Sequence, residues 1–370
     1  MLAVIVVAAP VLSGASATAW AAQPPEPTEQ CRVTDKRLDE LSGLASDGQH
    51  RYAVNDGGSS VRVFVLDRNC AVQRVINNPT DPYDVEDLAR TADGTLWLAD
   101  TGDNEKKRDT VALHALTPRG TSTLYRLVYP DGPHDSEALL VDRSGTPYLV
   151  TKNVLGAAEV YRPASPLTSP GPTPLERVAS VSIRSTDTPG GPVAGVVGSV
   201  LVTGGAVSAD GTVVALRTYT DAYLFSAPDG DVVAALGRTP VRIPLANEPQ
   251  GEAIAFDPDG TLLSGSEGVG QPVRAVPGAT ALAAGADQSG ADQSGAEQTG
   301  AGQAEPERSA TAGTRPGSSA DQAGQPGADT GTTAQANEPD EASRTLPTIA
   351  VAAVVVVGLL VALGRRRRRG

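Results

Sequence analysis

The stretch "PYDVEDLARTADGTLWLADTGDN", Pro82 to Asn104, has the form of a single β-hairpin. Two apolar segments flank Asp93-Gly94, and Asp-Gly is a favoured turn between paired strands. The hairpin also carries carboxylates at its strand ends, namely Asp84, Glu86, Asp87, Asp100 and Asp103. The meaning of these acids depends on whether the pattern recurs along the chain.

The pattern occurs five times. The corresponding segments are "ELSGLASDGQHRYAVNDGG", "DVEDLARTADGTLWLADTGD", "DSEALLVDRSGTPYLVTKN", "TGGAVSADGTVVALRTYTD" and "QGEAIAFDPDGTLLSGSEG". Each turns at a glycine and resumes with an apolar strand. A third strand follows in "VRVFVLD", "VALHAL", "AEVYRP" and "AYLFSA", and a fourth in "AVQRVI", "TLYRLV", "LERVASVSI" and "VVAAL". Four short strands per unit are typical of a β-propeller blade.

The repeat spacing sets the number of blades. Ser42, Glu86, Glu137, Gly205 and Glu252 are 44, 51, 68 and 47 residues apart, whereas blades commonly run about 40–50 residues. The long interval holds either an insertion, favoured by its Pro-rich segments, or a degraded sixth blade. We therefore predict an all-β propeller of five or six four-stranded blades over residues 24–280, with "CRVTDKR" supplying the last strand from the N-terminus.

The two ends of the chain predict export and anchoring. Residues 1–21 combine an apolar run with Ala19-Trp20-Ala21, as in a secretory signal peptide; the alternative is an uncleaved anchor. Residues 346–364 form an uncharged apolar run before Arg365 to Arg369, which predicts a transmembrane helix with residues 365–370 in the cytoplasm. We expect the propeller to lie outside the cell.

The segment between propeller and predicted helix has a different composition. Residues 281–345 are rich in Gly, Ala, Gln, Ser and acidic residues, with few larger aliphatic side chains. Such a chain buries too little apolar surface to offset its conformational entropy, so we predict a disordered linker. Its role would be to hold the propeller at a distance from the membrane.

The net charge limits the classes of binding partner, and the two cysteines predict a disulfide. The formal net charge is −13, and the basic run is confined to the C-terminal tail, so nucleic acid is not an expected partner. We expect a monomer with an extracellular ligand or protein partner. Cys31 and Cys70 form an even pair in an exported domain, which predicts a disulfide. Closing the ring with "CRVTDKR" would bring Cys31 beside the outer strand of the first blade, where Cys70 lies.

The repeated acids can now be placed. The first strand of each propeller blade lines the central channel, and alternate strand residues share a face. Two positions per repeat are polar: the first holds Glu40, Asp84, Asp135, Thr203 and Gln250, and the second Ser42, Glu86, Glu137, Gly205 and Glu252. The second strands end near Asp56, Asp100, Lys152, Thr218 and Glu267. We predict that these groups converge at one mouth of the channel.

Three interpretations of this ring stay open at the level of sequence. Polar residues can simply line a water-filled channel. Carboxylate oxygens with little His or thiolate instead suit a hard cation such as Ca²⁺; the candidate ligands are Asp84, Glu86, Asp135, Glu137, Glu252, Asp56, Asp100 and Glu267. Carboxylates with raised pKa can also act as catalytic acids or bases, with Glu86, Glu137, Glu252 and Lys152 as candidates.

Other site chemistries lack their sequence patterns. The chain has three histidines and no G-x-S-x-G elbow, zinc-ligand spacing, P-loop or dinucleotide fingerprint. Lys152 is the basic residue among the second-strand ends and would either receive an anion or neutralise a carboxylate.

The series "SGLA…YAVNDGG", "VEDLA…LWLADTGDN", "SEALL…YLVTK" and "GEAIA" resembles exported bacterial propellers, including the esterase-like phytase family and its NHL-like relatives. The resemblance spans the whole predicted domain. It implies calcium-dependent phosphoester or ester hydrolysis in some members and binding in others, with Glu86, Glu137, Glu252, Asp56, Asp100 and Glu267 as the matching residues. Calcium-dependent propeller phytases hold phosphate with several basic residues, whereas here only Lys152 and Arg217 fall at comparable strand ends.

The sequence thus predicts a membrane-anchored cell-surface propeller that binds a ligand or partner at an acidic channel mouth. The alternative is a calcium-dependent hydrolase of phosphoesters or esters.

Overall fold

The computed structural model describes residues 24–154, 157–193 and 196–285. The predicted signal peptide (1–21), most of the linker (286–345), the predicted transmembrane helix (346–364) and the Arg-rich tail (365–370) lie outside the described residues. In the part of the chain that is described, no helix is long and apolar enough to cross a membrane.

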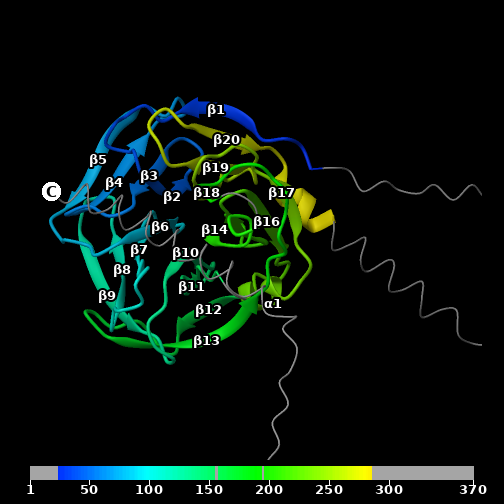
Figure 1. Ribbon diagram of the computed structural model, residues 1–370. Coiled ribbons are helices and arrows are strands. Elements are labelled where there is room, and N and C mark those ends of the chain that lie inside the picture. Colours follow the sequence, from blue (N-terminus) through cyan, green and yellow to red (C-terminus); the bar gives the residue numbers. More distant parts are fainter. Residues whose placement is uncertain (1–23, 155–156, 194–195, 286–370) are drawn as a thin grey trace, which may run out of the picture. The chain divides into compact units, whose positions relative to one another are not determined.

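The described chain folds into five antiparallel units of four strands each, arranged around a centre (Figure 1). The first unit is β2 (Leu41–Ser46), β3 (Arg51–Asn55), β4 (Val61–Leu66) and β5 (Val72–Asn78). The second is β6 (Val85–Arg90), β7 (Leu96–Asp100), β8 (Val111–Leu116) and β9 (Ser122–Val128). The third is β10 (Ser136–Val141), β11 (Pro147–Thr151), β12 (Ala158–Pro163) and β13 (Thr173–Val181).

The fourth unit is β14 (Val202–Val207), β15 (Val213–Thr218), β16 (Asp221–Ser226) and β17 (Val241–Pro244). The fifth is β18 (Gly251–Phe256), β19 (Leu262–Ser266), β20 (Pro272–Val276) and, from the N-terminus, β1 (Thr28–Arg32). A short parallel pairing of β9 with β13 joins the second and third units at their rims.

The first strands of the units form the inner ring. β2, β6, β10, β14 and β18 each contact the next, and β18 contacts β2, so the ring is closed. Figure 1 shows these strands around the centre and β1, β5, β9 and β13 at the rim. The architecture is therefore a β-propeller with five blades over the described residues. The long repeat interval is an insertion, because residues 182–193 and 196–201 contain no strand.

The inner hairpins form where the sequence predicts them. In the second blade Gly94 has a φ of 86°, a conformation that a side chain disfavours. Asp93 accepts hydrogen bonds from Thr91 Oγ1 at 2.6 Å and from Thr95 N at 3.0 Å, which fixes the turn between β6 and β7.

Ring closure follows the sequence prediction in two respects. β1 pairs with β20, so the N-terminus supplies the outer strand of the last blade, although of the predicted segment "CRVTDKR" only Cys31 and Arg32 lie in that strand. Cys31 on β1 forms a disulfide with Cys70, which lies between β4 and β5, with their Cα atoms 5.6 Å apart. The disulfide thus joins the fifth blade to the first. Both cysteines belong to a buried cluster with Leu44, Phe64 and other apolar residues.

The inner strands approach one another closely because small residues face the gaps between blades. A Cβ on Gly43 would lie 2.6 Å from the backbone nitrogen of Leu88, in the next blade. Asp87 bridges three blades: its fully buried carboxylate accepts hydrogen bonds from the backbone nitrogens of Leu139 (2.8 Å) and Gly205 (3.0 Å), as well as from Leu88 (2.7 Å).

Two local sequence interpretations differ from the structure. "VVAAL" is not the fourth strand of its blade but a short helix, α1 (Val232–Leu236), whose N-cap Asp231 accepts a hydrogen bond from Ala234 N. The outer strand is instead β17. The folded part also continues past residue 280: residues 279–285 are helical, and Ala279 and Ala283 are buried in an apolar cluster with Ile254.

Candidate functional site

A β-bulge occurs near the start of the inner strand in every blade. The pairing shifts between Leu41 and Gly43, Val85 and Asp87, Ser136 and Ala138, Val202 and Gly204, and Gly251 and Ile254. The bulged positions are Ser42, Glu86, Glu137, Thr203 and, within a longer irregular stretch, Glu252. A bulge re-aims a side chain that regular pairing would fix, and three of the five hold a glutamate.

This register corrects the sequence alignment of the fourth blade. Thr203, not Gly205, is the equivalent of Glu86 and Glu137. Thr203 Oγ1 donates a hydrogen bond to Gly251 O at 2.8 Å, linking the fourth blade to the fifth. Ser42 Oγ similarly donates to Glu86 O, linking the first blade to the second. At these two bulged positions the hydroxyl therefore joins neighbouring blades. The other three bulged positions carry a carboxylate.

Five of the predicted acids gather into two overlapping groups, which together are called the acidic cluster. Asp56, Asp84 and Glu86 form one, and Glu86, Asp135 and Glu137 form the other. Within each group one carboxylate oxygen per residue lies within 4.8 Å of the others. Asp56 follows β3, Asp84 and Glu86 belong to the start of the second blade, and Asp135 and Glu137 to the start of the third.

The three glutamates at the bulged positions are buried and incompletely hydrogen-bonded. Glu86, Glu137 and Glu252 are only 3–5% exposed. Within the described residues, Glu86 Oε1, Glu137 Oε2 and Glu252 Oε2 have no hydrogen-bond partner. A buried charged oxygen without a partner is costly, so the arrangement calls for a counter-charge or a proton.

Burial and mutual repulsion both act on these groups. Burial, followed by the charges of Asp56, Glu137, Asp84 and Asp135, raises the pKa of Glu86 well above its usual value. Burial also raises the pKa of Glu137, although Lys152 opposes the shift. Such perturbed carboxyl groups are characteristic of functional sites.

Lys152 supplies a positive charge to the cluster. Its Nζ forms a partly buried ion pair with Glu137 Oε1 and lies 5.4 Å from the ring centroid of Tyr219. Burial disfavours the ammonium, but Glu137 and the other nearby acids outweigh burial and raise the pKa of Lys152 well above its usual value. Lys152 therefore stays protonated and pairs with Glu137.

Glu252 and Glu267 extend the acidic cluster into the fifth blade. Gln250 Nε2 donates to Glu252 Oε1 at 3.1 Å. Burial, the charge of Glu252 and a hydrogen bond to it raise the pKa of Glu267 to about 10. Glu267 is therefore protonated near neutrality. Neither residue belongs to the two close groups around Glu86.

Asp100 does not join the candidate cation ligands. Its Oδ1 accepts from Asp84 N at 2.9 Å and Arg108 Nη2 at 3.0 Å, and its Oδ2 lies 3.2 Å from His114 Nε2. Burial opposes the charge of Asp100, but the hydrogen bond with His114 and the charge of Arg108 outweigh it and lower the pKa. Asp100 is held as a charged structural acceptor that positions the backbone before β6.

Arg217 is not available at the channel mouth either. Its side chain is fully buried and its Nη2 lies 2.7 Å from Glu248 Oε2. Nη1 donates to the carbonyls of Ala253 and Gly265 in the fifth blade. Arg217 therefore joins two blades, and of the basic residues considered from sequence only Lys152 reaches the acidic cluster.

Gly102 belongs to the site but was not among the residues predicted from the sequence. A Cβ at this position would overlap Glu86 Oε1 and lie 2.6 Å from Asp84 Oδ2. The glycine therefore leaves room for two carboxylates that come together beside it. Its place in "DTGDN" was the available signal, but that segment also fits an ordinary turn.

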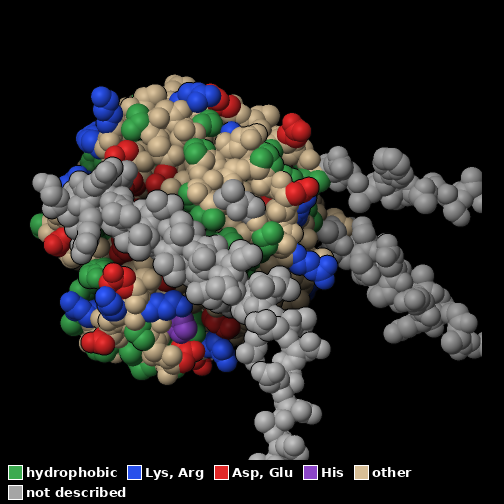
Figure 2. Space-filling model, viewed as in Figure 1, with side chains coloured by type: hydrophobic (Ala, Val, Ile, Leu, Met, Phe, Trp, Pro, Cys, Tyr) green, Lys and Arg blue, Asp and Glu red, His purple; other side chains and the backbone are tan. Residues whose placement is uncertain are grey.

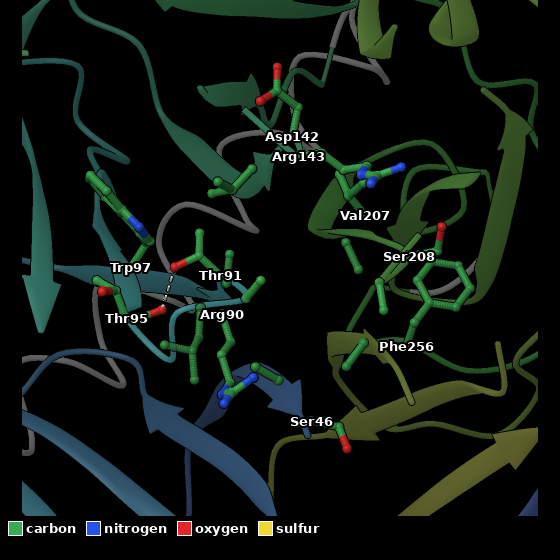
Figure 3. A pocket seen from close by; sticks show the side chains of 18 of the residues that line it. Ser46, Arg90, Thr91, Thr95, Trp97, Asp142, Arg143, Val207, Ser208 and Phe256 are labelled. Carbon is green, nitrogen blue, oxygen red and sulfur yellow. Dashed lines mark hydrogen bonds between the residues drawn. The ribbon is translucent and has the colours of Figure 1, made fainter. Parts of the chain in front are cut away.

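The large cavity lies elsewhere. A cavity of about 770 Å³ opens at the other ends of the inner strands, lined by residues such as Arg90, Trp97, Arg143 and Phe256 (Figure 3). Its acids serve the hairpin turns: Asp142 Oδ1, for example, accepts from Ser144 N and Thr146 N. It contains none of the residues of the acidic cluster. Orphaned oxygens and close acidic groups mark the opposite end of the inner ring, near Glu86, as the chemically distinctive end.

Charge on the outer surface is mixed. Figure 2 shows Lys and Arg side chains interspersed with Asp and Glu around the rim of the visible face.

No family model and no curated protein matches the chain. Three similar solved structures are a PQQ-bound aldose sugar dehydrogenase from Streptomyces coelicolor (12% identity, TM-score 0.37), a gluconolactonase from Xanthomonas campestris (13%, 0.37) and a virginiamycin B lyase from Staphylococcus aureus (12%, 0.35). The matches cover 68%, 69% and 64% of this chain and 99%, 99% and 66% of theirs, respectively. Similarity at this level carries no argument about activity.

Proposed function

We propose that the acidic mouth of the propeller binds a divalent cation, with Ca²⁺ as the best fit, and through it an extracellular ligand rich in oxygen anions. The observation that carries the proposal is Glu86, a buried carboxylate with an orphaned oxygen that belongs to two close acidic groups. Ca²⁺ takes oxygen ligands at about 2.3–2.6 Å in flexible geometry, which fits donor oxygens lying within 4.8 Å of one another.

The cation would serve both the protein and the ligand. It would relieve the repulsion among Asp84, Glu86 and Asp135 and satisfy the orphaned oxygen. Carboxylates at this mouth would otherwise repel an anionic ligand. A bound Ca²⁺ commonly accepts six to eight oxygens, so positions beyond the protein ligands remain for carboxylate or phosphate oxygens of a partner.

Thermal unfolding of the purified full-length protein tests the proposal. Ca²⁺ at about one hundred times its Kd should stabilise the fold by about 2.7 kcal/mol, which raises Tm by roughly 5–10 °C for a domain of this size. Glu86→Gln with Glu137→Gln should abolish the rise. Glu176→Gln, at an exposed ion pair on β13, is the control and should retain it. A Ca²⁺-independent Tm in the unmutated protein would reject the proposal.

Calcium-dependent hydrolysis of a phosphoester or ester is the second candidate. Lys152 favours it, because a partly buried ammonium beside the acidic cluster could stabilise an anion held there. Turnover of p-nitrophenyl phosphate or acetate should then require Ca²⁺ and fall sharply in Lys152→Met. Turnover that is absent, or unchanged by Ca²⁺, leaves binding as the function.

We also propose that the propeller is displayed outside the cell by a C-terminal anchor. The basis is the uncharged run at 346–364 followed by Arg365 to Arg369. Protease added to intact cells should release the propeller by cutting within 286–345. Protection of the propeller until the cells are lysed would contradict this orientation.

A further inference from the structure

The two acidic groups share one residue. Asp56 and Asp84 approach Glu86 in one group, and Asp135 and Glu137 approach it in the other. Glu86 comes from the second blade and is flanked by acids from the first and third. Its carboxylate has two oxygens, and Oε1 is without a hydrogen-bond partner in the described structure. A carboxylate in this position can serve two neighbours at once.

The space around Glu86 is consistent with two separate positions. Oε1 and Asp84 Oδ2 both border the point where a Cβ on residue 102 would lie, and Gly102 keeps that point free. In the other group, Glu137 Oε2 is buried and unpartnered, although Glu137 Oε1 binds Lys152. Each group therefore includes an oxygen that lacks a hydrogen bond, on residues from different blades.

We infer that the acidic cluster holds two divalent cations side by side, bridged by the carboxylate of Glu86. This inference rests on the proposed cation site and specifies its composition. One cation would be held by Asp56, Asp84 and Glu86, and the other by Glu86, Asp135 and Glu137. Bridged cations in two-metal sites lie about 3.5–4 Å apart and can clamp two oxygens of one phosphoryl or carboxyl group.

The two positions should differ in affinity. Lys152 already neutralises Glu137, so a cation in the second position meets the repulsion of the ammonium or must compete with it. Glu86 forms no such ion pair within the described residues, and Lys152 contacts the second position through Glu137. The Asp56/Asp84/Glu86 position should fill first, and the Glu86/Asp135/Glu137 position at higher Ca²⁺ concentration.

Counting bound ions tests the inference. The full-length protein, stripped with chelator, is titrated with Ca²⁺ by calorimetry, and bound Ca²⁺ is measured by equilibrium dialysis. We expect two ions per chain with dissociation constants at least tenfold apart. Asp84→Asn and Asp135→Asn should each retain one ion, the former losing the tighter and the latter the weaker. Glu86→Gln should weaken both, and the exposed control Asp131→Asn should retain two.

Gly102→Ala provides a second variant that removes no carboxylate from the chain. Its methyl group would displace the bridging Glu86 carboxylate and should therefore weaken both ions, as Glu86→Gln does. Unfolding in chelator should confirm that each variant is folded. One ion per chain, lost equally in Asp84→Asn and Asp135→Asn, would overturn the two-cation inference but leave the proposed cation site standing. No bound ion in the unmutated protein would overturn both.

Discussion

At the scale of single residues, Glu86 is the central group of the proposed cation site. It occupies the bulged position of β6, is buried, and lies beside acids contributed by three blades. Glu137 occupies the same position one blade later but is paired with Lys152. Equivalent places in the repeat therefore carry different electrostatic roles, because the second-strand end contributes Lys152 in one blade and Asp100 in another.

Glu267 predicts how stability without added cation depends on pH. Its pKa is raised from 4.5 to about 10, so the folded state holds this proton more tightly than the unfolded chain. Its contribution is fully present below the unfolded pKa and is lost as pH rises through the folded pKa. In chelator, the free energy of unfolding should decline between about pH 5 and pH 10, and Glu267→Gln should flatten this decline. A stability that rises over this range in the unmutated protein, or an unaltered slope in the variant, would contradict the assignment.

At the scale of elements, the sequence revealed the hairpins well and the fourth blade poorly. The glycine turns and apolar second strands are strong local signals that the structure confirms. "VVAAL" is apolar enough for a strand, but the Asp231 cap and the following Gly237 favour a helical turn. The misaligned Thr203 lacks the carboxylate that marks three other blades, so only the bulge in the pairing identifies it.

The convergence of acids was predictable from repeat position, but their partners were not. Arg217 and Asp100 both lie at second-strand ends, yet Arg217 binds Glu248, which precedes the next blade, and Asp100 lies beside His114 on the neighbouring strand. A single sequence specifies strand alternation but not which long side chain turns inward between blades. Gly102 was missed for a related reason: its significance is the space it leaves.

The Arg217–Glu248 pair joins the fourth and fifth blades and should be costly to break. Both side chains are buried, and Glu248 Oε1 also accepts a hydrogen bond from Ser264 at 2.7 Å. Glu248→Gln leaves a buried guanidinium without its counter-charge and should lower the free energy of unfolding by about 3–5 kcal/mol. Glu176→Gln, at an exposed pair, should cost at most about 1 kcal/mol. Equal effects in denaturant titrations would show that burial does not matter here.

At the scale of the whole molecule, the ring is closed by chain ends that are far apart in sequence. β1 completes the last blade, and the Cys31–Cys70 disulfide ties that blade to the first. Both features were predictable because the last repeat lacks an outer strand and the N-terminal segment has the length to supply it. The closed ring fixes the relative positions of acids from different blades. The geometry of the acidic cluster therefore depends on ring closure.

Removing the disulfide should therefore loosen the whole propeller. The cysteines are 39 residues apart, and the chain-entropy estimate for such a loop is about 4 kcal/mol. Cys31→Ser with Cys70→Ser should lower the free energy of unfolding by an amount of this order and shift the Ca²⁺ titration to higher concentration. A double variant as stable as the unmutated protein would contradict the proposed coupling between closure and site.

A cation site at Glu86 is tested most directly by anomalous scattering from crystals of the protein soaked in Tb³⁺, which substitutes for Ca²⁺ at oxygen sites. We predict an anomalous peak within about 2.3–2.6 Å of a Glu86 carboxylate oxygen, with carboxylate oxygens of its close neighbours completing the coordination. A fully soaked crystal with no peak at Glu86, or with terbium bound only at surface carboxylates, would contradict the claim that this mouth is a cation site.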